Sequence, residues 1–225
     1  MKNLVKDFLD LLFPVTCPGC NEALTSGEKV LCFLCAADLA VFKNEINIES
    51  ILGGRIKIDM GAIYLKFYSG GIVQRLLHEV KYKKNKDLGE LLGEKFMHHD
   101  KTYSRLKNVD VIVPIPLHEN KLRQRGYNQS EVIANGINKV LGKPMDTSSV
   151  VRVKSSQTQT RKSREERWRN VSGIFECSPE AFDNKNVLLI DDVITTGATM
   201  EACAQVILAS GARSISFAAI AIAMK

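Results

Sequence analysis

Two adjacent carboxylates, followed closely by threonines and a glycine, are the residues of this chain best suited to bind a ligand. Asp191 and Asp192 follow the apolar run 187–190, and the polar turn 195–199 comes shortly after them. A loop that leads into a helix offers free backbone N–H groups and the positive end of the helix dipole to an anion. Gly197 lets the backbone approach a phosphate, whereas carboxylates repel a phosphate and suit hydroxyl donors. The stretch therefore predicts a site for a sugar 5-phosphate with free 2- and 3-hydroxyls.

The elements around this site follow from the apolar pattern. The run 187–190 predicts a buried parallel strand, and we expect both acids to follow its carboxyl end. The segment 200–208 predicts a helix, with Gly211 as its stop signal. The order of strand, acid pair, hydroxyl-rich turn and helix is more specific than a glycine-rich loop alone.

A second strand and loop could bind another phosphate group. The segment 109–116 predicts a buried strand whose two prolines end its pairing, and a helix is expected over 131–140. The loop between them carries Arg123 and Arg125, and arginine can hold a phosphate with two parallel hydrogen bonds. A basic surface loop is the alternative. His118 in this loop could act as a base, but a structural or solvent-facing role is the preferred interpretation.

The stretch around the acid pair closely resembles the phosphoribosyl pyrophosphate (PRPP) motif of type I phosphoribosyltransferases. The resemblance implies that Asp191 and Asp192 bind the ribose hydroxyls and that Mg²⁺ accompanies PRPP. It also implies that Arg123, Arg125 and Lys81 neutralise the departing pyrophosphate. The residues implied to hold the 5-phosphate are Thr195, Thr196, Gly197, Ala198 and Thr199.

Four of the six cysteines form a second constellation. Cys17, Cys20, Cys32 and Cys35 have the spacing C-x2-C-x11-C-x2-C. Two such knuckles predict tetrahedral thiolate coordination of zinc, and four cysteine ligands leave no open position, so we expect the metal to be structural. Two disulfides are the alternative, which a cytosolic location disfavours. Cys203 is interpreted as a core residue on an apolar helical face.

Composition and length limit the function classes. The length of 225 residues suits one full domain plus an appendage. The net charge of +6 suits a phosphorylated ligand or nucleic acid as partner. Asp7 and Asp10 interrupt the first apolar segment, which argues against a secretory signal and favours a packed amphipathic helix over membrane-surface docking. The apolar run 217–224 is too short to cross a bilayer. We therefore expect a cytoplasmic protein without a transmembrane segment, with peripheral contact at the inner membrane left open.

The rest of the chain supplies further elements and two basic segments. A strand is expected over 61–68 and helices over 72–80 and 88–97. The lysine-rich run 81–87 is either a solvated turn or a contact surface for pyrophosphate or nucleic acid. The polar segment 152–169, which contains Trp168, is expected to be a mobile lid or disordered.

Taken together, these pieces resemble the ComF family of competence proteins, and the resemblance covers almost the whole chain. Its matching residues include the four paired cysteines, the runs 113–118, 123–129 and 191–199, and Gln159, Arg164 and 167–170 in the lid. The resemblance implies a zinc-finger N-terminus on a phosphoribosyltransferase-type domain. It also implies a role in natural transformation, in the uptake or handling of incoming single-stranded DNA.

These observations define an expected architecture and two functional hypotheses. We expect an α/β fold, a type I phosphoribosyltransferase-like parallel sheet flanked by helices, with residues 1–45 as an N-terminal helix and zinc-ribbon module and 46–225 as the main domain. The first hypothesis is an enzyme that transfers phosphoribosyl from PRPP to an unidentified acceptor. The second is a non-catalytic PRPP sensor that grips single-stranded DNA, with other DNA-uptake proteins as further partners.

Overall fold

The computed structural model describes residues 13–42, 56, 58–99, 101–154 and 173–224. The helix expected before residue 13 lies outside these residues, as do the expected domain boundary at residue 45 and the polar segment 152–169 from residue 155 onward, which includes Trp168. Arg152, at the start of that segment, lies in strand β3 (Val150–Arg152) and not in a mobile lid.

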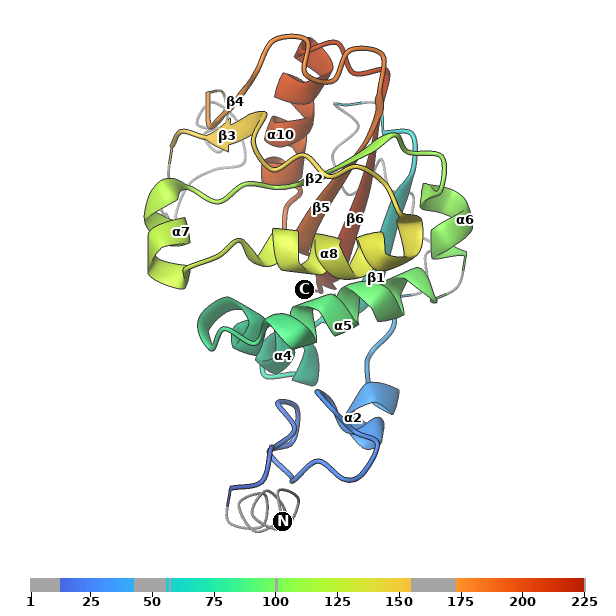
Figure 1. Cartoon of the computed structure of the whole chain (residues 1–225), viewed down its shortest axis with the longest axis vertical. Coiled ribbons are helices and arrows are strands. Elements are labelled where there is room, and N and C mark those ends of the chain that lie inside the picture. Colours follow the sequence, from blue (N-terminus) through green and yellow to red (C-terminus); the bar gives the residue numbers. More distant parts are fainter. Residues whose placement is uncertain (1–12, 43–55, 57, 100, 155–172, 225) are drawn as a thin grey trace, which may run out of the picture.

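A sheet of four parallel strands forms the centre of the molecule (Figure 1). Its order is β1 (Gly61–Phe67), β6 (Ser214–Ala223), β5 (Asn186–Ile194) and β2 (Val111–Pro114). All three strand pairs are parallel. The expected parallel sheet is therefore confirmed, and β5 and β6 at its centre are the longest of the described strands.

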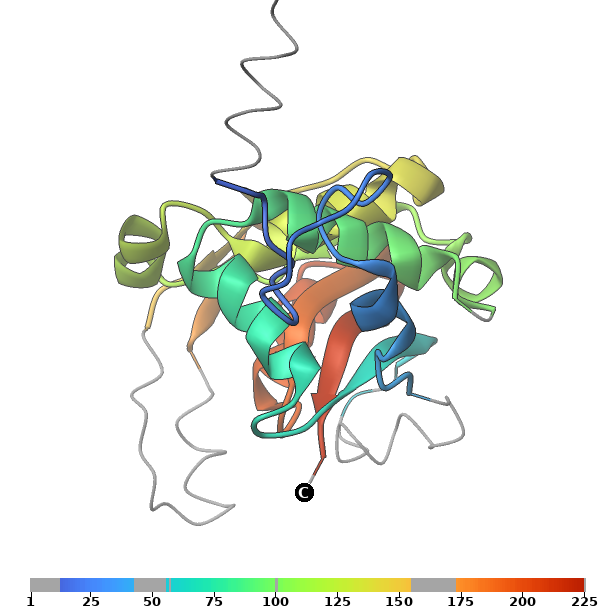
Figure 2. The same cartoon turned by 90° about the horizontal axis from the view of Figure 1, so that it is seen from below.

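Helices cover both faces of the sheet because successive side chains of each strand point in opposite directions. On β5, Leu188 and Ile190 belong to one buried cluster, whereas Val187 and Leu189 belong to the other. The first cluster includes α4 (Ile72–Tyr82), α5 (Lys86–Met97) and α8 (Gln129–Leu141), and the second includes α10 (Ala198–Ala209). Figures 1 and 2 show α5 and α8 side by side on their face of the sheet. The shorter elements are α2 (Phe33–Ala37), α6 (Thr102–Leu106), α7 (Glu119–Arg125) and the antiparallel pair β3 (Val150–Arg152) and β4 (Phe175–Cys177).

Helices α5 and α8 cross at glycines. A Cβ atom on Gly136 would lie 2.0 Å from the carbonyl oxygen of Glu90, and one on Gly93 would lie 2.3 Å from that of Ile133. Both contacts are with backbone, which cannot rotate away as a side chain can. The two glycines therefore allow the helix backbones to approach more closely than any other residue would permit.

Irregular segments pair with both outer strands of the sheet. Beside β1, the N–H of Phe42 donates to Tyr64 O and the N–H of Lys66 donates to Ala40 O, each at 2.7 Å. Beside β2, Ile112 pairs with the segment 144–146: its N–H donates to Pro144 O and its carbonyl accepts from Asp146 N–H, each at 2.9 Å. Neither outer strand is left as a bare row of hydrogen-bonding groups.

Two local expectations were wrong. Strand β5 does not end at residue 190 but continues to Ile194, because β6 is long enough to pair with Asp191 through Ala219 and with Ile194 through Ile222. The acids therefore lie within the strand. The loop expected around the two arginines contains helix α7, which His118 caps at its start and Gly126 ends in the left-handed conformation (φ 80°).

Candidate functional site

The acid pair lies near the carboxyl end of β5, between helices α4 and α8. Asp192 is buried, and its carboxylate forms an ion pair with Lys81 from the last turn of α4. Asp191 is half-buried, and its Oδ1 accepts hydrogen bonds from Ser130 Oγ at 3.2 Å and from the Asp192 N–H at 2.9 Å. The structure thus brings together three of the residues that the sequence predicted and adds Ser130.

The surroundings of Asp191 favour the protonated form of its carboxyl group, compared with an aspartate side chain in water. Burial, followed by the negative charge of Asp192, raises the pKa of Asp191 to about 7, while the Asp192 N–H and the charge of Lys81 act in the opposite direction. The carboxyl therefore changes charge near neutral pH, and a ligand that donates hydrogen bonds to it would favour the ionised form.

The turn after β5 leads directly into α10. Thr195 and Thr196 are exposed, and Gly197 takes the left-handed conformation (φ 75°) at the N-cap of the helix. No side chain among the described residues caps this helix end. Helix α10 begins at Ala198, two residues earlier than expected, so Ala198 and Thr199 lie in its first turn. Its first backbone N–H groups are consequently available to an anion beside the acid pair.

The two predicted arginines lie in different surroundings. Arg125 donates a hydrogen bond to Gln129 Oε1 at 2.5 Å. Its guanidinium also lies over the ring of Tyr82, 5.2 Å from the ring centroid, and Tyr82 directly follows Lys81 in the sequence. Arg123 is exposed and pairs with Glu119 at 3.0 Å within α7. Arg125 therefore joins the end of α4 that carries Lys81, whereas the contacts of Arg123 remain on its own helix.

Two further cations, Lys121 and Arg152, were missed by sequence reasoning. Burial lowers the pKa of Lys121, and the charges of Arg152, Arg125 and Lys81 lower it further. Burial also lowers the pKa of Arg152, which the charge of Asp191 opposes. The geometry also connects these residues. Arg152 bridges to His118, which caps the helix α7 that carries Lys121 and Arg125, and Arg125 lies over Tyr82, the neighbour of Lys81. Lys81, Lys121, Arg125 and Arg152 are called the cationic cluster below. Lys121 lies two residues before Arg123 and could have been included, and Arg152 begins the basic segment 152–169, but nothing in the sequence singles out Ser130.

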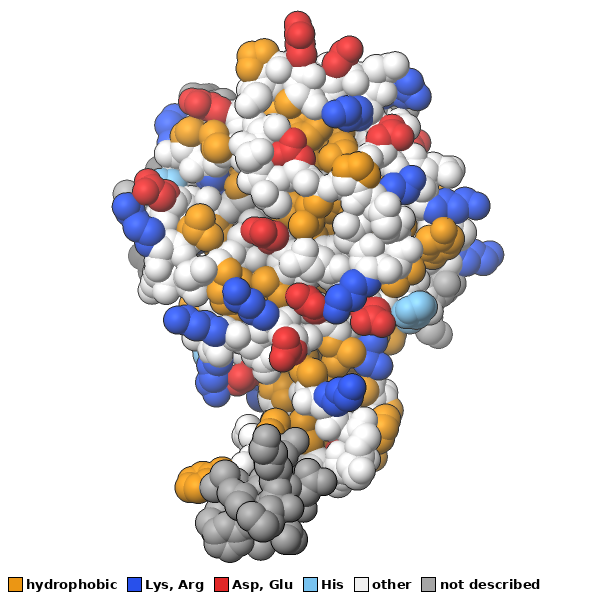
Figure 3. Space-filling model, viewed as in Figure 1, with side chains coloured by type: hydrophobic (Ala, Val, Ile, Leu, Met, Phe, Trp, Pro, Cys, Tyr) orange, Lys and Arg blue, Asp and Glu red, His pale blue; other side chains and the backbone are white. Residues whose placement is uncertain are grey.

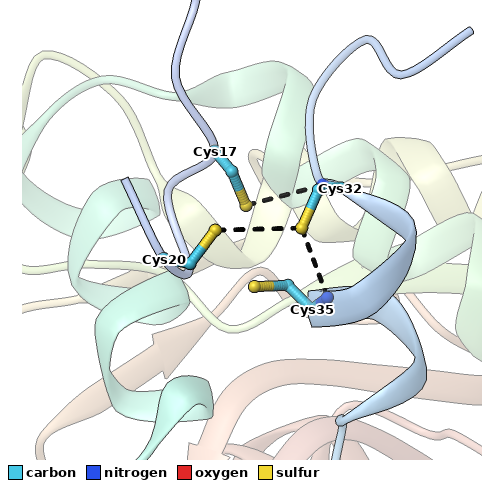
Figure 4. Close-up of side chains that lie close together, drawn as sticks. All are labelled: Cys17, Cys20, Cys32 and Cys35. Atoms are coloured by element: carbon cyan, nitrogen blue, oxygen red, sulfur yellow. Dashed lines mark hydrogen bonds between the residues drawn. The ribbon is translucent and has the colours of Figure 1, made fainter. Parts of the chain in front are cut away.

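The four paired cysteines converge on one point (Figure 4). Their sulfur atoms all lie within 4.8 Å of one another. Backbone N–H groups point at the sulfurs: Gly19 and Cys32 donate to Cys17 Sγ at 3.4 and 3.5 Å, and Cys35 donates to Cys32 Sγ at 3.3 Å. Burial raises the pKa of Cys17, but the N–H groups of Cys32, Gly19 and Cys20 outweigh it and lower the pKa to about 6. Four soft donors with N–H support fit a structural zinc ion.

Among the described helices, none is both long and apolar enough to cross a membrane.

Comparisons with known proteins agree with the fold. Residues 128–224 match the phosphoribosyl transferase domain family, and this range includes both acids and the threonine turn. The parallel sheet flanked by helices is accordingly a phosphoribosyltransferase-like fold, and the four-cysteine cluster fits a zinc-ribbon module.

Three curated relatives cover much of the chain. Competence protein F of Haemophilus influenzae is 30% identical over 146 residues, which are 64% of this chain and 63% of that protein. DNA utilization protein YhgH of Escherichia coli K12 is 27% identical over 143 residues, covering 62% of this chain and 63% of the relative. Competence protein ComFC of Bacillus subtilis is 33% identical over 107 residues, covering 47% of this chain and 42% of the relative. The chain thus spans less than two thirds of the length of each. This chain is therefore similar to proteins named for competence and for DNA utilization, and over residues 128–224 it is similar to the phosphoribosyl transferase domain family.

Proposed function

We propose that this protein binds PRPP and acts as a phosphoribosyltransferase-like component of DNA handling during competence. The observation that carries the proposal is that one short stretch holds two kinds of binding group, one suited to hydroxyls and the other suited to an anion. The acids of β5 suit the ribose hydroxyls, and the uncapped start of α10 suits the 5-phosphate. A sugar phosphate with free hydroxyls satisfies both.

Each group of residues has a distinct role in this proposal. Asp191 and Asp192 orient the ribose, and the N–H groups that follow Gly197 hold the 5-phosphate together with the threonine hydroxyls. The cationic cluster of Lys81, Lys121, Arg125 and Arg152 stabilises the charge that develops on pyrophosphate as its bond to the anomeric carbon breaks. When bound with PRPP, Mg²⁺ supplies additional charge neutralisation at the pyrophosphate. A nucleophilic acceptor then attacks a ribose with oxocarbenium character, a reaction that depends on positioning more than on a strong base.

Calorimetric titration with PRPP and Mg²⁺ tests the binding site. Replacing Asp192 or Thr196 with alanine should weaken PRPP binding by about 1–3 kcal/mol, the cost of one well-made polar contact. Asp38→Ala is the control, because this exposed residue caps α2 and lies outside the site. Unchanged titrations of both site variants would reject the proposed site. Release of pyrophosphate from PRPP in the presence of cell-extract metabolites would distinguish an enzyme from a PRPP sensor.

A second candidate function, binding of single-stranded DNA, is favoured by the surface at the end of α4. Tyr82 is 57% exposed, its ring contacts His78 and Arg125, and lysines flank it at positions 81, 83, 84 and 86. Exposed aromatic rings among cations are suited to stacking against bases while the cations contact phosphates. Over the face seen in Figure 3 as a whole, basic and acidic side chains are intermixed.

Salt dependence of DNA binding tests this candidate. The concentration of basic side chains predicts that the affinity for DNA falls steeply with salt and depends little on sequence, since phosphate contacts release counterions. Replacing Lys83, Lys84, Arg161 and Lys162 together should lower the affinity and flatten the salt slope, with PRPP binding retained. If the quadruple variant bound an oligothymidylate as tightly as the parent at each salt concentration, these residues would be solvated surface only.

A further inference from the structure

Helix α4 contacts both the four-cysteine module and the proposed PRPP site. It has 11 residues, and at about 1.5 Å per residue it spans roughly 16 Å. Its apolar face is buried in the same cluster as Cys17, Cys32 and Cys35. The residues of that face are Val73, Leu76, Leu77 and Val80. One short and well-packed helix therefore contacts two regions that lie far apart in the sequence.

The first turns of α4 hold the first cysteine knuckle. Arg75 Nε donates a hydrogen bond of 3.0 Å to the carbonyl oxygen of Gly19, which lies between Cys17 and Cys20. A Cβ atom on Gly19 would lie 2.7 Å from Cys35 Sγ and 3.2 Å from Ile72 Cδ1. The knuckle is thus packed between the sulfur cluster on one side and α4 on the other, without space for a larger residue.

The last turn of α4 contacts both acids, one directly and one through α8. Lys81 pairs with Asp192, and the carbonyl oxygen of Val80 accepts a hydrogen bond from the Tyr127 hydroxyl. Tyr127 directly precedes the N-terminus of α8, where the hydroxyl of Ser130 donates to Asp191. A displacement of α4 along its axis would therefore change the surroundings of both carboxylates.

We infer that α4 couples the metal-binding module to the ribose-binding acids, so that zinc at the cysteines and a ribose phosphate at β5 each strengthen binding of the other. This inference rests on the proposed function. Zinc fixes the knuckle, the knuckle fixes Arg75 and Ile72, and α4 then keeps Lys81 beside Asp192. With Lys81 in place, the two carboxylates repel one another less and remain oriented toward the ribose hydroxyls. Arg75 is a positioning residue in this scheme.

Equilibrium linkage provides the test, because coupling between two sites changes both affinities by the same factor. The zinc affinity of the full chain is measured by competition with a chromogenic chelator, with and without saturating ribose 5-phosphate. This probe carries the hydroxyls and the phosphate but has no pyrophosphate to bind metal. We expect ribose 5-phosphate to raise the zinc affinity by about fivefold or more, the lower end of typical allosteric coupling. Inorganic phosphate alone serves as the control for direct effects on the metal.

Variants at both ends of the helix locate the coupling. The coupling factor is the ratio of the zinc affinities measured with and without ribose 5-phosphate. Arg75→Ala should bring this factor close to one, while the protein still binds one zinc and unfolds cooperatively. Lys81→Met, which leaves the module untouched, should have the same effect. Arg213→Ala is the matched control, because Arg213 is an exposed arginine bonded to Asn184 at 2.9 Å, outside both regions, and it should retain the parental factor.

The outcomes separate the inference from the function on which it rests. If the parent bound neither PRPP nor ribose 5-phosphate, the proposed function would fail and the coupling with it. If the parent bound ribose 5-phosphate without a change in zinc affinity, only the coupling would be overturned. A factor that survives in both Arg75→Ala and Lys81→Met would likewise exclude α4 as its carrier.

Discussion

Lys81, in the last turn of α4, forms an ion pair with Asp192 on β5, although the two residues lie in distant parts of the sequence. The side chain of Lys81 is 23% exposed and that of Asp192 is 8% exposed. A carboxylate with so little contact with water depends on its partner for charge compensation. Lys81 therefore stabilises the site before any ligand is bound.

Replacing Lys81 with methionine should destabilise the folded protein. The change preserves most of the side-chain volume but leaves Asp192 without its counter-charge, and we expect a loss of about 1–3 kcal/mol in the free energy of unfolding. Urea denaturation near neutral pH measures it. Lys83→Met is the control: its 2.8 Å pair with Glu79 involves a lysine side chain that is 64% exposed, and such pairs contribute about 0–1 kcal/mol. Equal losses in the two variants would contradict a special role for Lys81.

The pKa of Asp191 near 7 predicts that ribose 5-phosphate binds more tightly as the pH rises through neutrality. The ionised carboxylate accepts hydrogen bonds from two hydroxyls better than the protonated acid does. Titration calorimetry between pH 5.5 and 8.5, a range chosen to bracket the shifted pKa, gives the profile. A phosphate monoester itself titrates near pH 6, and Asp191→Asn supplies that baseline. Parallel profiles for parent and variant would rule out Asp191 as the titrating group.

The same raised pKa affects folding stability in a defined direction. An unfolded Asp releases its proton near pH 3.9, whereas folded Asp191 keeps its proton up to about pH 7. Between these values the folded state binds more protons, so this group's contribution to stability falls as the pH rises and levels off above neutrality. Chemical denaturation at several pH values should show this decline in the parent and a shallower one in Asp191→Asn.

Zinc is expected at one ion per chain in protein purified without added metal. The converging sulfurs and their N–H donors motivate this stoichiometry. Elemental analysis measures it, and strong chelators should release the ion and loosen the segment 13–42. Cys32→Ser should lower the zinc content, whereas Cys177→Ser should not, because Cys177 lies on β4 outside the cluster. Two disulfides and no metal would refute the assignment.

Gly136→Ala should be strongly destabilising although it adds a single methyl group. Its Cβ would lie 2.0 Å from a backbone oxygen of α5, so the helices must separate, at a cost of about 1–3 kcal/mol or more. Asn135→Ala, on the neighbouring half-buried position of the same helix, should change stability much less. Thermal unfolding compares them. A neutral Gly136→Ala would mean that the close crossing of α5 and α8 is not required.

The sequence predicted the fold class well, because the fold class depends on local patterns. The apolar run before Asp191 predicts a buried strand, and paired cysteines predict a metal knuckle from spacing alone. The end of β5 was placed too early because acidic residues are unusual inside a strand. Only the length of β6 shows that β5 continues past the acids, because β6 pairs with β5 as far as Ile194.

Other parts of the site could not be predicted because they depend on tertiary contacts. Ser130 reaches Asp191 only after α8 has packed against the sheet, and Arg152 lies beside His118 only because β3 runs next to the start of α7. Likewise, Gly93 and Gly136 look like helix-weakening residues until α5 and α8 are brought together.

The segments that pair with the outer strands limit how another protein can attach. An unpaired strand edge is a template for a partner's strand, which would extend the sheet by main-chain hydrogen bonds. Here the segment 40–42 occupies the β1 side and the segment 144–146 occupies the β2 side. A partner that docks at these two positions must therefore recognise side chains and not main-chain groups, so mutations of surface side chains there should alter its specificity directly.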